Sequence, residues 1–487
     1  MILSVYRSRM RPTRSDFWKF NGIRIMKKQF FFKAVILLTA VFIFECIFCL
    51  ASRAALKGGC AKVNITPPVG VWLSGYGGRD KPSDGIVDEL YARALVLDDG
   101  NNSVAIISAD LLWVPLWMTN QVRQILKDKI GIPEQNVMIC ATHTHFGPKI
   151  YSESKMGPED SDDAVDDSYV QTLVKKITDS AFLAHKGMED AKIGAVKGDL
   201  PEIVYNRRPT RADGSVQTMF TLPLEVTATR KVQRNPDGSV RVTFTFPPEE
   251  PALTFGQVDP QAWVLRVENA EGQNIGSMVN FACHAVSGST FTDWFYSISA
   301  DYPGETARVV EQVERGVCLF TSGTAGDIVP LRRGKKPRYE IGRALAGEAV
   351  RRLQFVQTSC DIDIAAMTQQ VTLPLRQDIS PDRIIDNDKN KKQITTEIQV
   401  LRIGDVYILG LPGEVLVEVG LEIKKKAGLE RLIIASLSND TIGYVCHSRA
   451  YEQGGYEATS GTNLAKGAGE IIISQAMDIL DKVKAQR

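Results

Sequence analysis

The sequence has few histidines, five in 487 residues, and almost no net charge. Lysine and arginine number 58 and aspartate and glutamate 57, which leaves a formal charge of +1. A basic field that attracts nucleic acid and an acidic solvating tract are both missing, so we expect no nucleic-acid partner. An HExxH motif and internal repeats are absent as well, and the six cysteines that follow Ala54 form no CxxC zinc pair. These absences exclude repeat architectures and the commonest short zinc motifs.

Long hydrophobic runs are confined to the N-terminus. "MKKQFFFKAVILLTAVFIFECIFCLASRA" has two lysines after Met26, an apolar run over about 34–50, and small residues at Ser52 and Ala54. This pattern predicts that residues 1–54 are an N-terminal extension plus a signal peptide, and that 55–487 form a single domain. We expect a secreted or periplasmic protein whose translation starts at Met1 or Met26. The run is also long enough to span a bilayer, so a retained membrane anchor is the alternative.

Cleavage after Ala54 would leave six cysteines. A secreted protein can pair some of them, but their spacing does not define a connectivity. Four adjoin apolar runs, where a cysteine acts as a small buried hydrophobe; these are Cys140, Cys283, Cys318 and Cys446.

Strand-like and helical segments alternate over residues 103–187, which indicates an α/β arrangement. "SVAIISA" (103–109) and "NVMICAT" (136–142) are predicted as buried strands, and a helical segment follows each one. His185 lies near the end of the second helical segment, a common place for a solvated histidine. We therefore do not consider it a site residue.

The rest of the chain has a mixed character. Turn dipeptides and alternating apolar residues over 205–260 predict hairpins. A β-meander then leads to His284, a strand and glycine-bearing loop contain Asp327, and a helix is expected to begin near Glu414 after a Pro-Gly turn. The predicted fold is α/β, with mixed β-sheets flanked by helices.

Polar side chains follow six of these predicted strands, where open α/β sheets place their ligand crevice. Residues i and i+2 of an extended chain share a face, so the two histidines of "HTH" should point the same way. Two imidazoles and a carboxylate form a catalytic zinc ligand set with positions left for water and substrate. Each residue alone has an ordinary structural explanation, and only their joint occurrence favours a metal site. The residues are Asp110, His143, His145, His284, Asp327, Glu414 and Tyr444.

Ten short motifs in order give this chain a specific resemblance. From about Cys60 to the C-terminus it resembles the neutral/alkaline (non-lysosomal) ceramidase family. The matching stretches are "LSGYGG", "DELYARALVL", "ISADL", "ATHTHFGP", "YNRRP", "NFACHAVS", "SADYPG", "GTAGDIVP", "LPGEVLVEVG" and "IGYVCHSRAYEQGGYEATSG".

The resemblance implies a zinc amidase that cleaves the N-acyl bond of ceramide, and hence a role in sphingolipid metabolism. It implies a catalytic group in which His145 helps to hold the substrate carbonyl or the developing oxyanion and Arg207 lies at the substrate polar head. General zinc chemistry also requires a proton for the leaving amine, and His145 and Asp327 are the candidates to relay it. Zinc-bound water is the expected nucleophile, since zinc lowers its pKa to about 7. The implied zinc ligands are His143, His284, Glu414 and Tyr444.

The chain departs from the family pattern in three places. Val329 of "GDIVP" replaces a serine treated as an active-site residue, the segment from "GDIVP" to "LPGE" is short, and we expect no C-terminal immunoglobulin-like domain. We expect a small-molecule or lipid substrate, either ceramide or another amide, with weak or no activity on long-chain ceramide. A lipid substrate is compatible with peripheral membrane contact. The alternatives are an inactive relative that binds a lipid or glycan, and a zinc hydrolase acting on an ester or glycoside-type compound.

Overall fold

The computed structural model describes residues 55–150, 165–248, 252–288, 293–378 and 391–486. The predicted signal peptide or membrane anchor over 1–54 lies outside these residues, and Ala55–Arg487 form one compact unit. Within the described part, no helix combines the length and the apolar character needed to cross a membrane.

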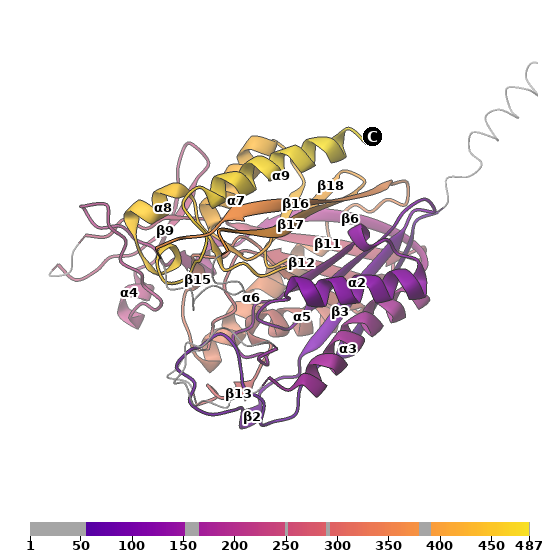
Figure 1. Cartoon of the computed structure of the whole chain (residues 1–487), viewed down its shortest axis with the longest axis horizontal. Helices are drawn as coiled ribbons and strands as arrows, with labels where there is room; N and C mark the ends of the chain where they lie inside the picture. Colours follow the sequence, from indigo (N-terminus) through magenta and orange to yellow (C-terminus); the bar gives the residue numbers. More distant parts are fainter. Residues whose placement is uncertain (1–54, 151–164, 249–251, 289–292, 379–390, 487) are drawn as a thin grey trace, which may run out of the picture. The chain divides into compact units, whose positions relative to one another are not determined.

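An eight-stranded mixed sheet forms the centre of this unit (Figure 1). The pairs β4–β5 and β12–β14 are parallel, and the other neighbours are antiparallel. The strands, in spatial order, are β14 (Val317–Ser322), β12 (Asn274–Phe281), β11 (Gln261–Asn269), β6 (Glu189–Asp199), β1 (Lys57–Asn64), β3 (Tyr91–Asp98), β4 (Ser103–Ala109) and β5 (Val137–Ala141).

A four-stranded sheet packs against one face of the large sheet. Its strands, in spatial order, are β16 (Ile364–Pro374), β17 (Gln393–Ile403), β18 (Val406–Gly410) and β20 (Leu432–Ala435).

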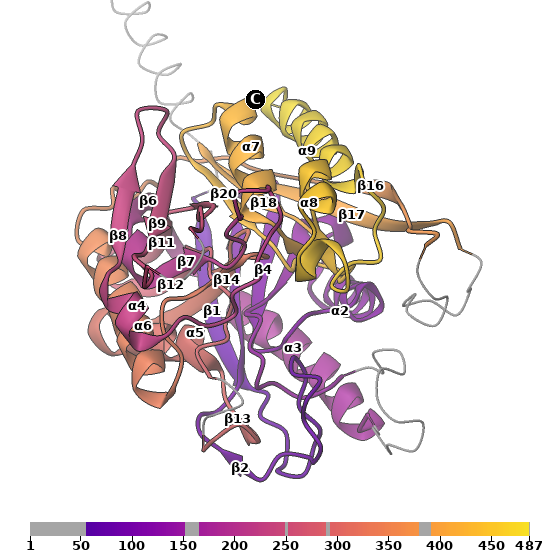
Figure 2. The same cartoon turned by 90° about the vertical axis from the view of Figure 1, so that its left-hand side faces the viewer.

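Helices cover the outer faces of both sheets (Figures 1 and 2). Helices α2 and α3, and the pair α5 and α6, lie on the large sheet, whereas α7 and α9 lie on the small one. Their bounds are α2 (Leu116–Ile130), α3 (Asp167–Lys186), α5 (Asp301–Glu314), α6 (Lys335–Leu353), α7 (Val417–Ala427) and α9 (Ala468–Lys484).

The alternation of side chains along each strand explains this layering. In β4, Ala105 and Ile107 contact the α2–α3 core, while Val104 and Ile106 contact the core between the two sheets. Successive side chains of a strand point to opposite faces. Both faces are covered, so the strand is an unbroken apolar run, as the sequence predicted.

Local sequence signals set the helix ends. The Asp166 side chain accepts a hydrogen bond from the amide of Tyr169 and caps α3. Gly131 and Gly428 end α2 and α7 in the left-handed conformation, where glycine has no steric penalty.

Short elements connect the layers. The region 205–260 forms the predicted hairpin, β8–β9, and also contains a short helix. The remaining elements are β2 (Gly85–Ile86), β7 (Val204–Asn206), α4 (Leu224–Ala228), β8 (Lys231–Arg234), β9 (Val240–Thr243), β10 (Gln257–Val258), β13 (Ser297–Ile298), β15 (Ile328–Pro330), β19 (Glu414–Val415), β21 (Tyr444–Val445), α8 (Ser448–Gln453), and the 3-10 turns η1 (Glu134–Asn136), η2 (Pro201–Ile203) and η4 (Tyr456–Ala458).

The helix predicted near Glu414 is α7, although Glu414 itself is not part of it. Glu414 lies in β19, which pairs in parallel with β21, and α7 begins at Val417. Gly413 at φ 70° turns the chain before Glu414 and lets these strands pair. The six cysteines within the described residues are all free, and the four in apolar runs are buried, as predicted.

A candidate metal centre

The two histidines of "HTH" converge through a turn rather than through strand alternation. The strand β5 ends at Ala141, and His143 has φ 65°, a left-handed conformation that is uncommon for a residue other than glycine. The expectation that this segment is extended is therefore wrong, but the two histidine side chains still point the same way, as expected. The two Nε2 atoms lie 3.3 Å apart. A strained backbone of this kind is frequent at functional sites.

His284 and Glu414 complete the cluster from two other strands. The amide of His284 donates to the Ile328 carbonyl, which holds the loop after β12 beside β15. Glu414 Oε2 lies 3.0 Å from His284 Nε2 and 3.2 Å from His143 Nε2. Tyr444, paired with Glu414 across β19 and β21, places its hydroxyl 3.3 Å from His284 Nε2. The four predicted zinc ligands thus lie within one cluster of side chains.

Each imidazole has the same arrangement of hydrogen bonds. The Nδ1 atoms of His143 and His145 lie 2.9 Å from the carbonyls of Leu112 and Gly75, and His284 Nδ1 lies against the Ala325 carbonyl. A carbonyl only accepts, so each Nδ1 carries the hydrogen and each Nε2 presents a lone pair. Metal-ligating histidines are held in this way in proteins.

Most of the centre is buried, with His145 half-buried, and this burial shifts the pKa values of its groups. Burial, with the charge of Arg207, lowers the pKa of His284 to about 4. Burial and the charges of His143 and His284 lower the pKa of His145 well below its ordinary value. Burial raises the pKa of Glu414, but the charges and hydrogen bonds of His143 and His284 outweigh it and hold that pKa well below its usual range. Neutral imidazoles and an ionised carboxylate are the forms that bind metal.

These donors fit a zinc ion. Three Nε2 lone pairs that face one another repel unless a cation lies among them, and the candidate ligand atoms of His143, His145 and His284 lie within 4.8 Å of one another. Nitrogen and carboxylate oxygen are preferred zinc ligands. Two ligand sets share His143 and His284. One adds Glu414 and Tyr444, and the other adds His145.

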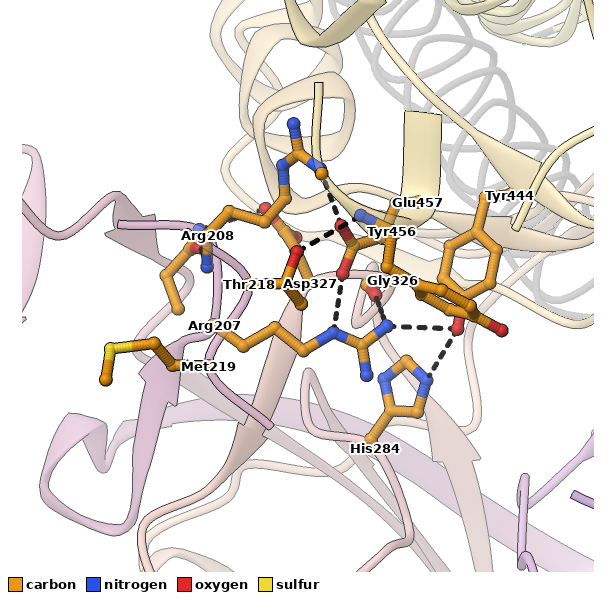
Figure 3. Close-up of polar contacts among 12 residues, drawn as sticks. Arg207, Arg208, Thr218, Met219, His284, Gly326, Asp327, Tyr444, Tyr456 and Glu457 are labelled. Atoms are coloured by element: carbon orange, nitrogen blue, oxygen red, sulfur yellow. Dashed lines mark hydrogen bonds and ion pairs between the residues drawn. The ribbon is translucent and has the colours of Figure 1, made fainter. Parts of the chain in front are cut away.

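Arg207 lies beside the centre in a group that Figure 3 shows. Its Nη2 donates to the Tyr444 hydroxyl (3.0 Å) and to the Gly326 carbonyl (2.9 Å), and its Nε donates to Glu457 Oε1 (2.6 Å). Arg208 donates to the other oxygen of Glu457 at 2.5 Å. Sequence reasoning found Arg207 but missed Arg208 and Glu457.

Asp327 lies near this group without touching the histidines. Its carboxylate accepts from the Asn206 side chain and the Val417 amide, both at 2.9 Å, and its carbonyl accepts from the Arg207 amide. Burial raises its pKa to about 6. A proton-relay role for Asp327 therefore stays a prediction, since its carboxylate is bonded to Asn206 and Val417 rather than to His145.

Asp110 does not join the cluster, contrary to expectation. Its carboxylate binds Arg93 at 2.7 Å and the Tyr91 amide at 2.8 Å. The buried arginine on the neighbouring strand β3 takes this carboxylate because an unpaired buried charge is costly. His185 lies at the end of α3, as predicted.

A glycine missed by sequence reasoning shapes the position of His145. Gly75 of "LSGYGG" has φ 96°, and a Cβ on it would lie 2.6 Å from the His145 ring. Tyr76 contacts the same ring, with centroids 5.1 Å apart. The glycine is visible in the motif, but the sequence does not show that the fold places Gly75 against His145.

The fold and the donor set together define an α/β protein with a histidine-rich cluster that could hold a metal ion. Residues 57–212 match the model of the family "Neutral/alkaline non-lysosomal ceramidase, N-terminal". The chain is thus related to the neutral/alkaline ceramidases, as its motifs predicted.

Individual relatives agree with this relationship. The chain is 25% identical over 299 residues to neutral ceramidase B of Dictyostelium discoideum, covering 57% of this chain and 35% of that protein. It is 27% identical over 283 residues to the neutral ceramidase of Mycobacterium tuberculosis, covering 53% and 37%. The matches thus span about a third of the length of these relatives.

Solved structures show the same fold. The crystal structure of neutral ceramidase from Pseudomonas aeruginosa superposes with a TM-score of 0.66 at 20% identity, covering 88% of this chain and 75% of that one. A ceramidase complexed with C2 gives a TM-score of 0.67 at 19% identity, covering 89% and 76%. The prediction of mixed sheets flanked by helices is confirmed.

Proposed function

We propose that this chain is a zinc-dependent hydrolase that cleaves an N-acyl amide, with a substrate smaller or more polar than long-chain ceramide. The observation that carries the proposal is the meeting of His143, His284, Glu414 and Tyr444, with the Nδ1 atom of each imidazole bonded to a carbonyl. The names of the relatives, all neutral ceramidases, support amide hydrolysis.

His143, His284, Glu414 and Tyr444 would hold the zinc. When bound, zinc supplies a Lewis acid and lowers the pKa of a water to about 7. His145 shares the same pocket, and its hydrogen bond to Gly75 makes Nε2 a proton acceptor. We assign it the role of general base towards the attacking water. Once protonated, it would become the acid that donates to the leaving amine.

Arg207 would stabilise negative charge that develops on the carbonyl oxygen. Its Nη2 donates to the Tyr444 hydroxyl at 3.0 Å, and its Nε and Nη2 make the hydrogen bonds described above, so the two N–H groups of Nη1 are assigned to the substrate. A fixed donor in a site shielded from water contributes strongly to transition-state stabilisation. This assignment moves the oxyanion role from His145, where the resemblance placed it, to Arg207.

Val329 is the reason for proposing a changed substrate. It is fully buried in β15 and pairs with Tyr205 of β7, so it fills space where the family has a serine hydroxyl. A valine offers no hydrogen bond to an amide. The same residue favours a second candidate function, a metal-holding protein that binds a lipid or glycan without turnover.

The experiment that separates these functions is hydrolysis of N-acyl amides of graded chain length, with parallel ester and glycoside substrates. Each is measured with zinc and after chelation. Zinc-dependent release of a short or polar acyl group supports the proposal. Tight binding of a panel member without any turnover supports the second function. Efficient cleavage of long-chain ceramide refutes the changed substrate.

We also propose that the protein is exported, with cleavage after Ala54. The composition of residues 26–54 supports this, and the cut would leave the unit Ala55–Arg487 complete. N-terminal sequencing of the protein from its native source is the test. A mature N-terminus at Met1 or Met26 would contradict cleavage and favour the retained anchor.

A further inference from the structure

Two adjacent arginines and one glutamate form a buried ion cluster beside the metal centre. Arg207, Arg208 and Glu457 are 3%, 6% and 0% exposed. Glu457 Oε1 accepts from Arg207 Nε at 2.6 Å, and Oε2 accepts from Arg208 Nη1 at 2.5 Å. One carboxylate therefore holds two guanidinium groups, and the cluster keeps a net positive charge.

The cluster is fixed on the side away from the centre. Arg208 Nη2 donates to the Gly454 carbonyl at 2.8 Å, and a Cβ on Gly455 would lie 2.8 Å from Arg208 Nη1. Glu457 itself lies in η4, on the 3-10 turn that follows these glycines. Arg208 and the 454–457 segment thus form an anchor for the carboxylate.

Towards the centre, the cluster continues as a chain of hydrogen bonds. Arg207 Nη2 reaches the Tyr444 hydroxyl at 3.0 Å, and that hydroxyl lies 3.3 Å from His284 Nε2 (Figure 3). Glu457 is therefore three hydrogen bonds from His284, through Arg207 and Tyr444. An arginine has many rotamers, and a bond to Nε restricts the guanidinium to one plane.

We propose that Glu457, anchored by Arg208, is a positioning residue that aims the Arg207 guanidinium at the Tyr444 hydroxyl and at the reacting carbonyl. The predicted effect of Glu457 on turnover rests on the proposed function. The predicted effect of Glu457 on the position of the Arg207 guanidinium does not. Loss of a partner outside the ligand shell typically costs about 10- to 100-fold in metal affinity or activity.

The test is a double-mutant cycle of Glu457→Gln and Arg207→Met in the full chain. We expect Glu457→Gln alone to weaken zinc affinity about 10-fold and to lower kcat about 10- to 100-fold, with a smaller change in KM. In the Arg207→Met background, Glu457→Gln should cost little more, because its effect passes through Arg207. If the free-energy effects of the two substitutions on kcat and zinc affinity are fully additive, the proposal is wrong.

A matched control and a crystal structure keep the result interpretable. Glu397→Gln removes a half-buried carboxylate that pairs with another buried arginine, Arg123, at 2.7 Å. It should change thermal stability but neither kcat nor zinc affinity.

In metal-free Glu457→Gln crystals, the Arg207–Tyr444 bond should be lost. If the Arg207–Tyr444 bond persists at about 3 Å, the positioning role of Glu457 is wrong, whether or not the wild-type protein binds zinc. If instead the wild-type protein binds no zinc but the bond is lost, the proposed function fails and the positioning role stands.

Discussion

Replacing Gly75 by alanine should disable His145 without touching a ligand. The new Cβ would lie 2.6 Å from the His145 ring, whereas carbon atoms in contact prefer about 3.5–4.0 Å. The ring must therefore move by about 1 Å, and a displacement of that size can lower a rate by about 10²-fold. The positive φ of residue 75 adds about 1–2 kcal/mol of strain for a side chain. We expect Gly75→Ala to lose about 10²-fold in kcat while zinc content is unchanged.

Gly77→Ala is the matched control, since it lies in the same motif and a Cβ there meets nothing within 4 Å. The assay is kcat on the best substrate of the panel, with zinc measured on the same samples. Wild-type turnover in Gly75→Ala would refute a role for His145 in catalysis. Equal losses in both glycine variants would show that the loop as a whole, rather than the imidazole position, is affected.

Further predictions concern the metal, the pH dependence and the substrate. Zinc should be lost from His143→Ala and His284→Ala, whereas His145→Ala should keep zinc and lose about 10²–10⁴ in rate, the usual contribution of a general base. His185→Ala is the control that keeps both zinc and turnover, and elemental analysis with kinetics checks all four variants. Burial lowers the pKa of His284 from 6.5 to about 4, so between these values the unfolded chain binds more protons than the folded chain. The metal-free protein should therefore lose stability as pH falls through this window. The measurement is the melting temperature as a function of pH for the wild-type protein and for His284→Asn. If the melting temperature falls equally in both proteins, the lowered pKa of His284 is contradicted. Val329→Ser should not restore cleavage of long-chain ceramide, because the short 329–411 segment remains; ceramide turnover by this variant in a product-release assay would show that the hydroxyl alone was missing.

The sequence was most informative where burial imposes a pattern. Strands β4 and β5 are covered on both faces, so their apolar runs predicted them with nearly the observed bounds. Polar residues that follow such strands are conspicuous, and His143, His145 and His284 were found in this way. The meeting of these residues follows from the arrangement of the strand ends in the α/β fold.

Other features have no local signal. Glu414 follows a Pro-Gly turn and precedes a helical pattern, so only its pairing with Tyr444 shows that it lies in a strand. Asp110 looks like a ligand until the fold places Arg93 beside it. The contact between Arg208 and Glu457 joins residues 249 positions apart. Such pairs depend on tertiary packing, which a periodicity along the chain does not report.

The positions of the metal ligands are tested most directly by anomalous diffraction from zinc-loaded crystals, with data collected above and below the zinc edge. We predict one peak per chain at about 2.0–2.2 Å from His143 Nε2, His284 Nε2 and a Glu414 oxygen, with the Tyr444 hydroxyl as the fourth ligand and His145 Nε2 outside bonding distance. A peak bonded to His143, His145 and His284 but not to Glu414 or Tyr444, or no peak at this cluster, would contradict the account.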